Sequence, residues 1–456
     1  MSFFAMALLV FDGGVDVKAE ARKTLSEIDK KLKLLNKPAI KSIKSEDGDI
    51  IDCVDIYKQP AFDHPALKNH TIQMRPNTIF ASETSTTEHE SSPAMLTQTW
   101  QKSGSCPKGT VAIRRVKRKE LLNADSLEHF GRDGPRTSFA VNTTNDKSNF
   151  FGSFPAPEHS YANLYATENN YIGARGDINL WDPLVESYNE ISSAQISLKS
   201  GFVENFESIE AGWMVYPNLF NADGQPRLFI RWTLDGYRRT GCINLNCAGF
   251  VQTSSVIALG STFSNVSTLH GPQFQINIRI DHDPSTNHWW LHYYNEVVGY
   301  WPAEILCYLK EKAAIVAWGG DVYSKNVKPG HPSHTTAYMG SGEAASELFG
   351  RANFITNIRI IDYSLQLKYP DPAFFVVDEP NCYSALIYKA HPKSEPYFYF
   401  GGHPDNNCKS LCLVRGKFHS TLLEPWVDLD FSSFCNWVFF FGVQFGFLAV
   451  EKSANF

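Results

Sequence analysis

The spacing of apolar residues changes along the chain from a helical to a strand-like pattern. Between Leu25 and Leu35 the apolar residues recur three or four positions apart among Lys and Glu, and this spacing predicts a helix over residues 19–35. Asn36-Lys37-Pro38 follows and would end the helix, because proline cannot continue it. From about Asn163 onward the pattern becomes that of short strands.

Alternation with a period of two is clearest in Gln275–Ile280, where apolar and polar residues take turns. A single helix is predicted in this part of the chain, over Ala303–Ala314, where Pro302 introduces it. Many short strands with turn residues between them predict an all-β fold, either a β-sandwich or a barrel. The other expected strands are Leu228–Thr233, Asn353–Asp362 and Tyr397–Phe400. Asp235-Gly236 follows the first of these strands and predicts a hairpin turn.

The composition is that of a globular protein. The chain has 456 residues, of which 43% are hydrophobic and 20% charged, so it has room for one large domain or two to three smaller ones. Lys and Arg number 42 against 48 Asp and Glu, which gives a net charge of −6. This balance argues against a nucleic-acid partner, since such proteins contact phosphates with an excess of basic residues.

The first 19 residues are predicted to be a signal peptide. Phe3–Phe11 is an apolar run that is short for a membrane span but suits a signal sequence, although no Lys or Arg precedes it. The alternative is an amphipathic start of the first helix. Three Asn-X-Ser/Thr sequons, which begin at Asn69, Asn142 and Asn265, also favour export and would carry the glycans of a secreted protein.

Two further segments leave alternatives open. Ile113–Lys119 is the most basic stretch, and it could be a solvated strand edge or an exposed processing site. Phe434–Val450 is an apolar run in the last part of the chain, marginal in length for a membrane span. It could attach the protein to a membrane, or it could be a buried segment or a tail outside the functional fold.

Metal and nucleotide sites are not expected. The His331-Pro-Ser-His334 and His282-Asp283 pairs lack the ligand spacing of a zinc site, and no HExxH motif occurs. No GxGxxG, phosphate-binding loop or GxSxG nucleophile turn stands between a strand and a helix. The sequence therefore predicts neither a metal nor a cofactor.

Two carboxylates beside tryptophans are the candidates for chemistry. Glu210 precedes Trp213 by three positions, and Asp321 follows Trp318 by three. A carboxyl group held beside indoles is poorly solvated, so its pKa should rise, and two such groups in one cleft could share a proton for acid–base attack on an amide or glycosidic bond. The alternative is that each acid caps a turn or pairs with an arginine on a face of the sheet.

The chain resembles the plant neprosin-type family, in which a glutamic peptidase domain follows an activation-peptide domain. The activation-peptide part of the resemblance comprises 36–39, 41–53, 59–65, Ser105–Thr110 and Arg114-Arg115. The catalytic part comprises Gly212-Trp213-x-Val-Tyr-Pro217, Thr240–Gln252, Gly299-Tyr-Trp-Pro302, Trp318-Gly-Gly320, Met339-Gly-Ser-Gly342, Pro380-Asn-Cys-Tyr383, Gly401-Gly402 and Asn407-Cys408. Strings this long and rare are more specific than a spacing pattern.

This resemblance implies a secreted proenzyme of the extracellular space or cell wall, built on an antiparallel β-sandwich without a metal. It implies an acid-active endopeptidase that cleaves peptides after proline, with its own pro-domain as inhibitor. Two catalytic glutamates would fall on Glu210 and on position 321, where this chain has Asp321. The shorter side chain is compatible with a slower enzyme or with an inactive binding protein. Trp213 and Trp318, with Gly319 and Gly320, would shield the pair and contact a substrate proline.

The resemblance also implies a domain order and a set of disulfides. Residues 1–19 would be the signal peptide, 20–150 the pro-domain with its helix and linker, 151–412 the peptidase sandwich and 413–456 an atypical apolar tail. The implied disulfides are Cys53–Cys106, Cys242–Cys247 and Cys382–Cys408. Cys307 is expected to be a buried thiol on the 303–314 helix.

Overall fold

The computed structural model describes 14–78, 95–124, 126–128, 130–132, 158–167, 170–202, 205–220, 223–324, 327, 335–392 and 394–404, with the side chains of the first helix described from Leu25. These residues all belong to one compact unit. The core of the predicted signal peptide, the sequon at Asn142, Cys408 and the apolar run at 434–450 lie outside the described residues. The predicted boundary near residue 150 does so too.

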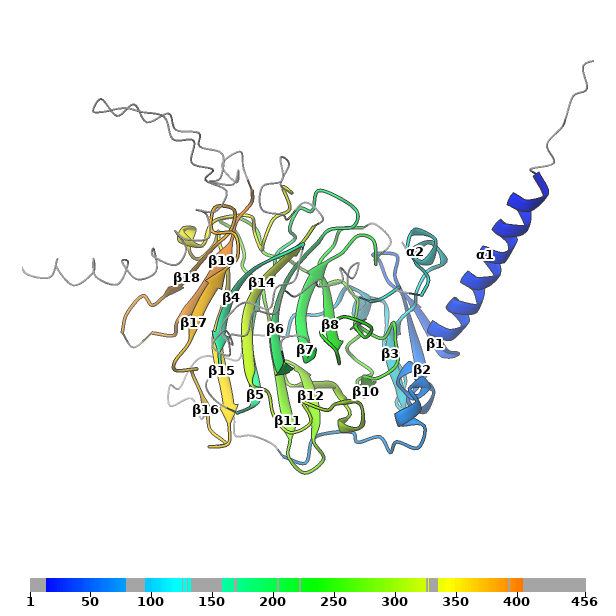
Figure 1. Cartoon of the computed structure of the whole chain (residues 1–456), viewed down its shortest axis with the longest axis horizontal. Coiled ribbons are helices and arrows are strands. Elements are labelled where there is room, and N and C mark those ends of the chain that lie inside the picture. The colour runs from blue at the N-terminus through cyan, green and yellow to red at the C-terminus, as the bar shows by residue number, and fades with distance from the viewer. Residues whose placement is uncertain are drawn as a thin grey trace, which may run out of the picture. The chain divides into compact units, whose positions relative to one another are not determined.

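Two antiparallel sheets form the larger part of this unit, and Figure 1 shows them as curved layers of strands. The seven-stranded sheet has the order β17 (Phe374–Val377), β4 (His159–Ala166), β14 (Ile315–Tyr323), β6 (Ile191–Phe202), β7 (Asn205–Val215), β8 (Arg227–Thr233) and β9 (Cys242–Ile243). The nine-stranded sheet has the order β10 (Val251–Gln252), β13 (Glu296–Trp301), β12 (His288–Tyr293), β11 (Gln275–Asp283), β5 (Tyr171–Asn179), β15 (Asn353–Asp362), β19 (Tyr397–Gly401) and β18 (Ser384–Tyr388), with β16 (Leu367–Lys368) paired to β15.

The main hydrophobic core lies between the two sheets. Trp213 of β7 and Trp318 of β14 are fully buried there, and their indole N–H groups donate to the backbone oxygens of Asn179 and Arg175 on β5. Burying large aromatic side chains from both inner faces is what holds a β-sandwich together. The predicted all-β antiparallel sandwich is therefore confirmed.

The N-terminal part forms a smaller layer of its own. It consists of α1 (Gly14–Leu35), β1 (Ala39–Lys44), β2 (Ile50–Asp55), β3 (Thr110–Arg114) and α2 (Arg118–Asn123), with β1, β2 and β3 in one antiparallel sheet. In Figure 1 the small sheet lies next to β8 and β10 with β3 nearest to them, and α1 extends away from it. This region, residues 14–132, is called the pro-region below.

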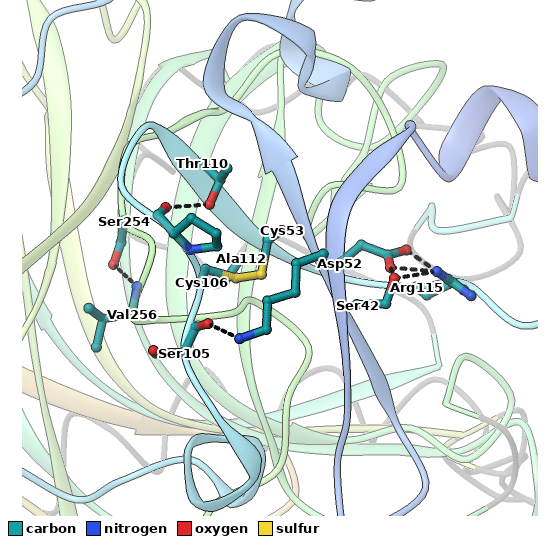
Figure 2. Close-up of a disulfide and its surroundings, with 12 residues drawn as sticks. Ser42, Asp52, Cys53, Ser105, Cys106, Thr110, Ala112, Arg115, Ser254 and Val256 are labelled. Carbon is teal, nitrogen blue, oxygen red and sulfur yellow. Dashed lines mark hydrogen bonds and ion pairs between the residues drawn. A yellow bond between two sulfur atoms is a disulfide. The ribbon is translucent and has the colours of Figure 1, made fainter.

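A disulfide between Cys53 and Cys106 joins β2 to the chain just before β3 (Figure 2). Lys41 Nζ donates to the backbone oxygen of Ser105 at 2.9 Å, and Arg115 forms an ion pair with Asp52 at 2.5 Å. These contacts hold both ends of the long segment 54–105 at the small sheet. Within this segment, Gln59 and Gln98 form hydrogen bonds with the backbone of the sandwich part.

Paired hydrogen bonds attach the pro-region to the sandwich. The Gln252 backbone N–H donates to the side-chain oxygen of Gln59 at 2.7 Å, and the Gln59 amide donates back to the Gln252 oxygen at 2.9 Å. Gln98 exchanges a similar pair with the backbone of Ala258. All four residues are buried, so these bonds are shielded from competing water.

A buried ion cluster lies at the same junction. Asp49, on the turn between β1 and β2, contacts Arg227 of β8 at 2.5 Å and Arg114 of β3 at 3.0 Å. Burial raises the pKa of Asp49, but the charges of Arg227 and Arg114 and their hydrogen bonds outweigh burial and hold this pKa at about 2. Arg114 also pairs with Glu120.

The local expectations for the basic stretch need correction. β3 is buried along its whole length and Arg114 is buried in the ion cluster, so this part of the stretch is not a solvated strand edge. Arg115 is partly exposed, and Arg118 and Lys119 of α2 are exposed, so an exposed processing site stays a prediction for that part of the stretch.

Asp235-Gly236 lies in the connection between β8 and β9, which pair antiparallel, so the predicted hairpin at this position is confirmed. There Asp235 accepts the backbone N–H groups of Arg238, Arg239 and Thr240.

The predicted helix over Ala303–Ala314 is wrong. Only a short 3-10 turn forms, over Ala303–Ile305, and Cys307 is exposed instead of buried. The cause lies on β7, where the Glu207 carboxylate accepts the backbone N–H groups of Cys307 and Leu309. Those donors are bound to a distant side chain, so they do not continue a helical ladder.

Candidate active site

Glu210 and Asp321 lie on the outer face of the seven-stranded sheet. Side chains alternate between the two faces of a strand, so residues three positions apart point in opposite directions. Glu210 on β7 therefore points away from Trp213, and Asp321 on β14 points away from Trp318. Both carboxylates are nevertheless buried, Glu210 at 2% and Asp321 at 0% exposure.

Glu210 is saturated with hydrogen-bond donors. One carboxylate oxygen accepts from the Ser208 hydroxyl at 2.6 Å and from the Tyr237 hydroxyl at 3.0 Å. The other accepts from Nε and Nη2 of Arg231 at 3.0 and 2.6 Å. Four donors occupy the roughly four lone-pair positions of a carboxylate, so Glu210 is bound as an anion.

Arg231 links the two carboxylates. It is the direct cross-strand partner of Glu210 on β8, and it is itself buried. Its guanidinium also contacts Oδ2 of Asp321, through Nη2 at 3.4 Å and Nη1 at 3.5 Å. A single guanidinium therefore bridges both predicted catalytic acids.

The charges around Glu210 reverse the pKa shift expected from the sequence. Burial raises the pKa of Glu210, as predicted, but the positive charges of Arg231 and Lys199 and the hydrogen bonds from Ser208 and Arg231 outweigh burial and hold the pKa at about 2. Lys199 lies on β6, and burial lowers its own pKa. The expectation of a raised pKa at Glu210 is wrong, and the alternative of an acid paired with an arginine on a sheet face describes this residue.

Asp321 has a second partner on the neighbouring strand. Nδ1 of His159, on β4, lies 2.8 Å from Oδ1 of Asp321, and the His159 side chain is 12% exposed. The imidazole stacks on Tyr161 with a centroid distance of 5.6 Å and packs against Tyr323 at 4.9 Å. The ring is thus fixed between two phenols with one nitrogen directed at the carboxylate.

The structure does not bring the predicted substrate-binding tryptophans to this face. Trp213 and Trp318 are in the core between the sheets, so they neither shield the carboxylates nor offer a ring to a substrate proline. Gly320 also faces the core, where a side chain would meet Phe400 and Met339. Gly319 lies on the same face as Asp321, and a side chain there would meet the backbone oxygen of Ala162 at 2.2 Å.

The pro-region packs against the same outer face. A hydrophobic cluster joins its side chains to residues of the sheet that share a face with the carboxylates. Tyr323 is two positions beyond Asp321, and Phe229 is two positions before Arg231 on β8. The cluster contains Ile28, Leu35, Val116, Leu121 and Phe130 from the pro-region, and Ile191, Met214, Phe229, Ile243 and Tyr323 from the sheet.

Sequence reasoning missed Arg231 and His159. A signal for Arg231 exists, since it is a lone cation inside the apolar run Leu228-Phe-Ile-Arg-Trp232. An arginine buried in a central strand needs an anionic partner. His159 gives no such signal, because its partner is 162 positions away.

The cysteines that were expected to form disulfides are bonded where they are described. Cys53–Cys106 and Cys242–Cys247 are both disulfides, and Cys382 is also disulfide-bonded. Asn69 and Asn265 are exposed. Within the described residues no helix is long and apolar enough to cross a membrane, and no three His, Cys, Asp or Glu side chains gather to hold a metal ion.

Comparison with protein families and solved structures adds the following. Residues 188–403 match the family described as Neprosin, and residues 42–165 match the Neprosin activation peptide. Among solved structures, scytalido-glutamic peptidase with a peptide-based transition-state analogue is 10% identical, covers 54% of this chain and 99% of its own, and has a TM-score of 0.30. SCP-B, a member of the Eqolisin family of peptidases bound to the tripeptide Ala-Ile-His, is 8% identical with the same coverages and a TM-score of 0.29. Similarity this low carries no inference about the reaction.

Proposed function

The chain belongs to the neprosin family, with the activation peptide ahead of the neprosin domain, and we propose that it is the proenzyme of a secreted, acid-active endopeptidase that cleaves after proline. One observation carries this proposal. The pro-region packs on the same sheet face that bears Glu210 and Asp321. A segment placed there restricts access to the two carboxylates, as an inhibitory pro-domain must.

The proposed chemistry is the attack of water on a peptide carbonyl beside Glu210 and Asp321. A carboxylate takes the proton from the attacking water, and a protonated group gives a proton to the departing amine. Asp321 stands where the family pattern has glutamate, so its carboxyl lies one methylene closer to the backbone. The substrate is a peptide or protein chain with a proline before the bond that is cut.

A second function is favoured by one specific observation. All four lone-pair positions of Glu210 are occupied by donors within the protein. A carboxylate fixed in this way suits a sandwich that has lost activity and binds an extracellular peptide or carbohydrate. Asp321→Glu separates the two functions, because restoring the longer arm should increase proteolysis in a weakened enzyme and should change nothing in a binding protein.

The test is an acid-activation assay on the full chain. We expect incubation between pH 3 and 7 to produce self-cleavage in the acidic part of the range, followed by hydrolysis of a proline-containing protein. Mass spectrometry of the products should find proline as the last residue at each newly formed C-terminus. A folded chain that cleaves neither itself nor the substrate at any pH would contradict the peptidase and favour the binding protein.

A further inference from the structure

The pro-region reaches the nine-stranded sheet through residues 69–78, which are called the strap below. The strap belongs to no helix or strand. Among the described residues, each hydrogen bond between the strap and the sandwich uses a side chain of the sandwich, that of Tyr300, Glu304, Asp283 or Ser285. The strap is therefore attached by side chains instead of a backbone ladder, and some of these side chains titrate.

Asp283, at the end of β11, accepts three donors of the strap. The Thr78 hydroxyl donates to Oδ1 at 3.1 Å, while the Asn77 backbone N–H and the Gln73 amide donate to Oδ2 at 2.8 and 3.3 Å. Burial raises the pKa of Asp283, but the hydrogen bonds from Asn77, Ser285 and Gln73 outweigh burial and hold it below its ordinary value of 3.8. The stabilisation from this carboxylate is therefore complete above pH 3.8 and is lost as pH falls further.

Two histidines meet under the strap. The side chain of His70 is only 4% exposed, and its Nε2 and Nδ1 lie 2.7 Å from the Tyr300 hydroxyl and 3.2 Å from a Glu304 oxygen. Its ring is 5.5 Å from that of His288 on β12. Nδ1 of His288 accepts the Ala303 backbone N–H at 3.1 Å, so a second proton on this ring would displace that donor. The docked strap thus favours the neutral form of His288.

The surroundings of His288 act in the same direction. Burial lowers the pKa of His288 below its ordinary value of 6.5, although some of its neighbours oppose this. The titratable groups that face it are Glu304 and Asp283, which raise its pKa, His70 and His282, which lower it, and the stacked phenol of Tyr300, whose own pKa burial raises to about 12. The neutral ring therefore stabilises the docked strap fully above pH 6.5, and this contribution is lost as pH falls below that value.

The strap is more sensitive to mild acid than the other attachments of the pro-region. The pKa of Asp49 in the buried ion cluster is held at about 2, so that cluster persists to a lower pH. The amides of Gln59 and Gln98 do not titrate. As pH falls, the strap therefore leaves the sheet before the rest of the pro-region does.

We propose that the strap detaches in acid and that the enzyme then cuts its own chain between Pro76 and Asn77. This inference rests on the proposed function, because it names a substrate bond for the same site. Pro76 is the single proline of the strap. While the strap is docked, the nitrogen of the Pro76–Asn77 bond donates to Asp283, so the future leaving group is held against the sheet. In the cut, the hydroxyl of water bonds to the carbonyl carbon of Pro76, the C–N bond breaks, and the remaining proton passes to the Asn77 nitrogen.

The position of this cut gives it a distinct signature. It falls between Cys53 and Cys106, which form a disulfide. The two pieces of the pro-region therefore stay covalently joined after the cut, and they separate only when the disulfide is reduced. The cut opens the pro-region without releasing it.

The first test follows the products of the full chain between pH 7 and 3. We expect a new N-terminus at Asn77 in acid, identified by mass spectrometry, and a small fragment that appears on reducing gels but not on non-reducing gels. Pro76→Ala should abolish this product. Pro65→Ala is the matched control, because Pro65 is exposed and precedes the strap, and it should leave the product unchanged.

The second test measures detachment without relying on the reaction. Hydrogen exchange of peptides that cover 69–78 is read in the first seconds after acidification, as protection relative to the free peptide of the same sequence. We expect protection to be lost between pH 6.5 and 4 in the wild type, and only below about pH 3.8 in His288→Asn, where the amide oxygen still accepts the Ala303 N–H but does not titrate. His270→Asn is the control, because this histidine is exposed and asparagine suits its positive φ of 56°.

The outcomes separate this inference from the proposed function. A strap that keeps its protection down to pH 3 would overturn the inference. So would a wild type that hydrolyses an added protein but never forms an N-terminus at Asn77. A strap that loses protection in a chain that cuts neither itself nor an added protein at any pH would overturn the proposed function, and the cut at Pro76 with it.

Discussion

The Arg231 guanidinium donates two hydrogen bonds to one oxygen of Glu210, at 3.0 and 2.6 Å. The two residues are direct cross-strand neighbours on β8 and β7, so the sheet register itself creates the pair. Both side chains are almost fully buried. Removing one member of such a pair leaves an uncompensated charge in a poorly solvated place.

Arg231→Met should therefore destabilise the protein by about 3–5 kcal/mol at neutral pH. The pKa of Glu210 is held at about 2, below its ordinary value of 4.5, so its stabilising contribution is complete above pH 4.5 and is lost as pH falls toward 2. The deficit of the variant should shrink over the same range. Chemical unfolding of the wild type and of Arg231→Met at pH 7, 4 and 2.5 measures this deficit in the free energy of unfolding. Arg351→Met removes two partly exposed ion pairs, with Glu343 and Glu347, and should cost about 1–2 kcal/mol at most. An equal deficit at all three pH values would contradict this account.

Asp49→Asn should weaken the junction between the pro-region and the sandwich. The pKa of Asp49 is held at about 2 against an ordinary value of 3.8, so its contribution to stability is complete above pH 3.8 and is lost as pH falls toward 2. We expect a lower Tm at pH 7 and little difference from the wild type near pH 2. Asp63→Asn breaks the more exposed pair with Lys37 and serves as the control. A Tm that does not change at pH 7 would show that the cluster does not stabilise the junction.

The Cys53–Cys106 disulfide should stabilise the pro-region substantially. It closes a loop of 53 residues, and the loss of loop-closure entropy in the unfolded chain corresponds to about 4 kcal/mol in the simple entropic treatment. Replacing both cysteines by serine should lower the denaturant midpoint of the full chain accordingly. Cys307→Ser should leave the midpoint unchanged, because that thiol is exposed and unpaired among the described residues. A double variant as stable as the wild type would contradict this assignment.

The strands could largely be predicted from sequence because their signal is local. Alternation in Gln275–Ile280 and in Asn353–Asp362 anticipates β11 and β15, since each pattern reflects one buried face of a sheet. The false helix at Ala303–Ala314 had a local signal too, but the Glu207 carboxylate, about a hundred positions earlier, binds its backbone donors. A contact over that distance leaves no trace in a local pattern.

The candidate site was only partly predictable for a related reason. The position of the tryptophans could have been found, because a three-residue offset within a strand places Trp213 on the face opposite to Glu210. The Arg231 bridge needs the register of β7 against β8, and the His159 contact needs β4 beside β14. Strand pairing decides both of these contacts, and spacing in the sequence does not encode it.

The most direct test of the central claim is the acid-dependent hydrolysis of a proline-containing protein by Glu210→Gln and Asp321→Asn. Glu347→Gln is the control, because it changes a partly exposed carboxylate that pairs with Arg351. We expect the wild type and Glu347→Gln to be active only at acidic pH. The two site variants should fold and lose at least about a hundredfold in kcat/KM, the scale of one acid–base contribution. Full activity in either site variant would contradict the assignment of the reaction to this face.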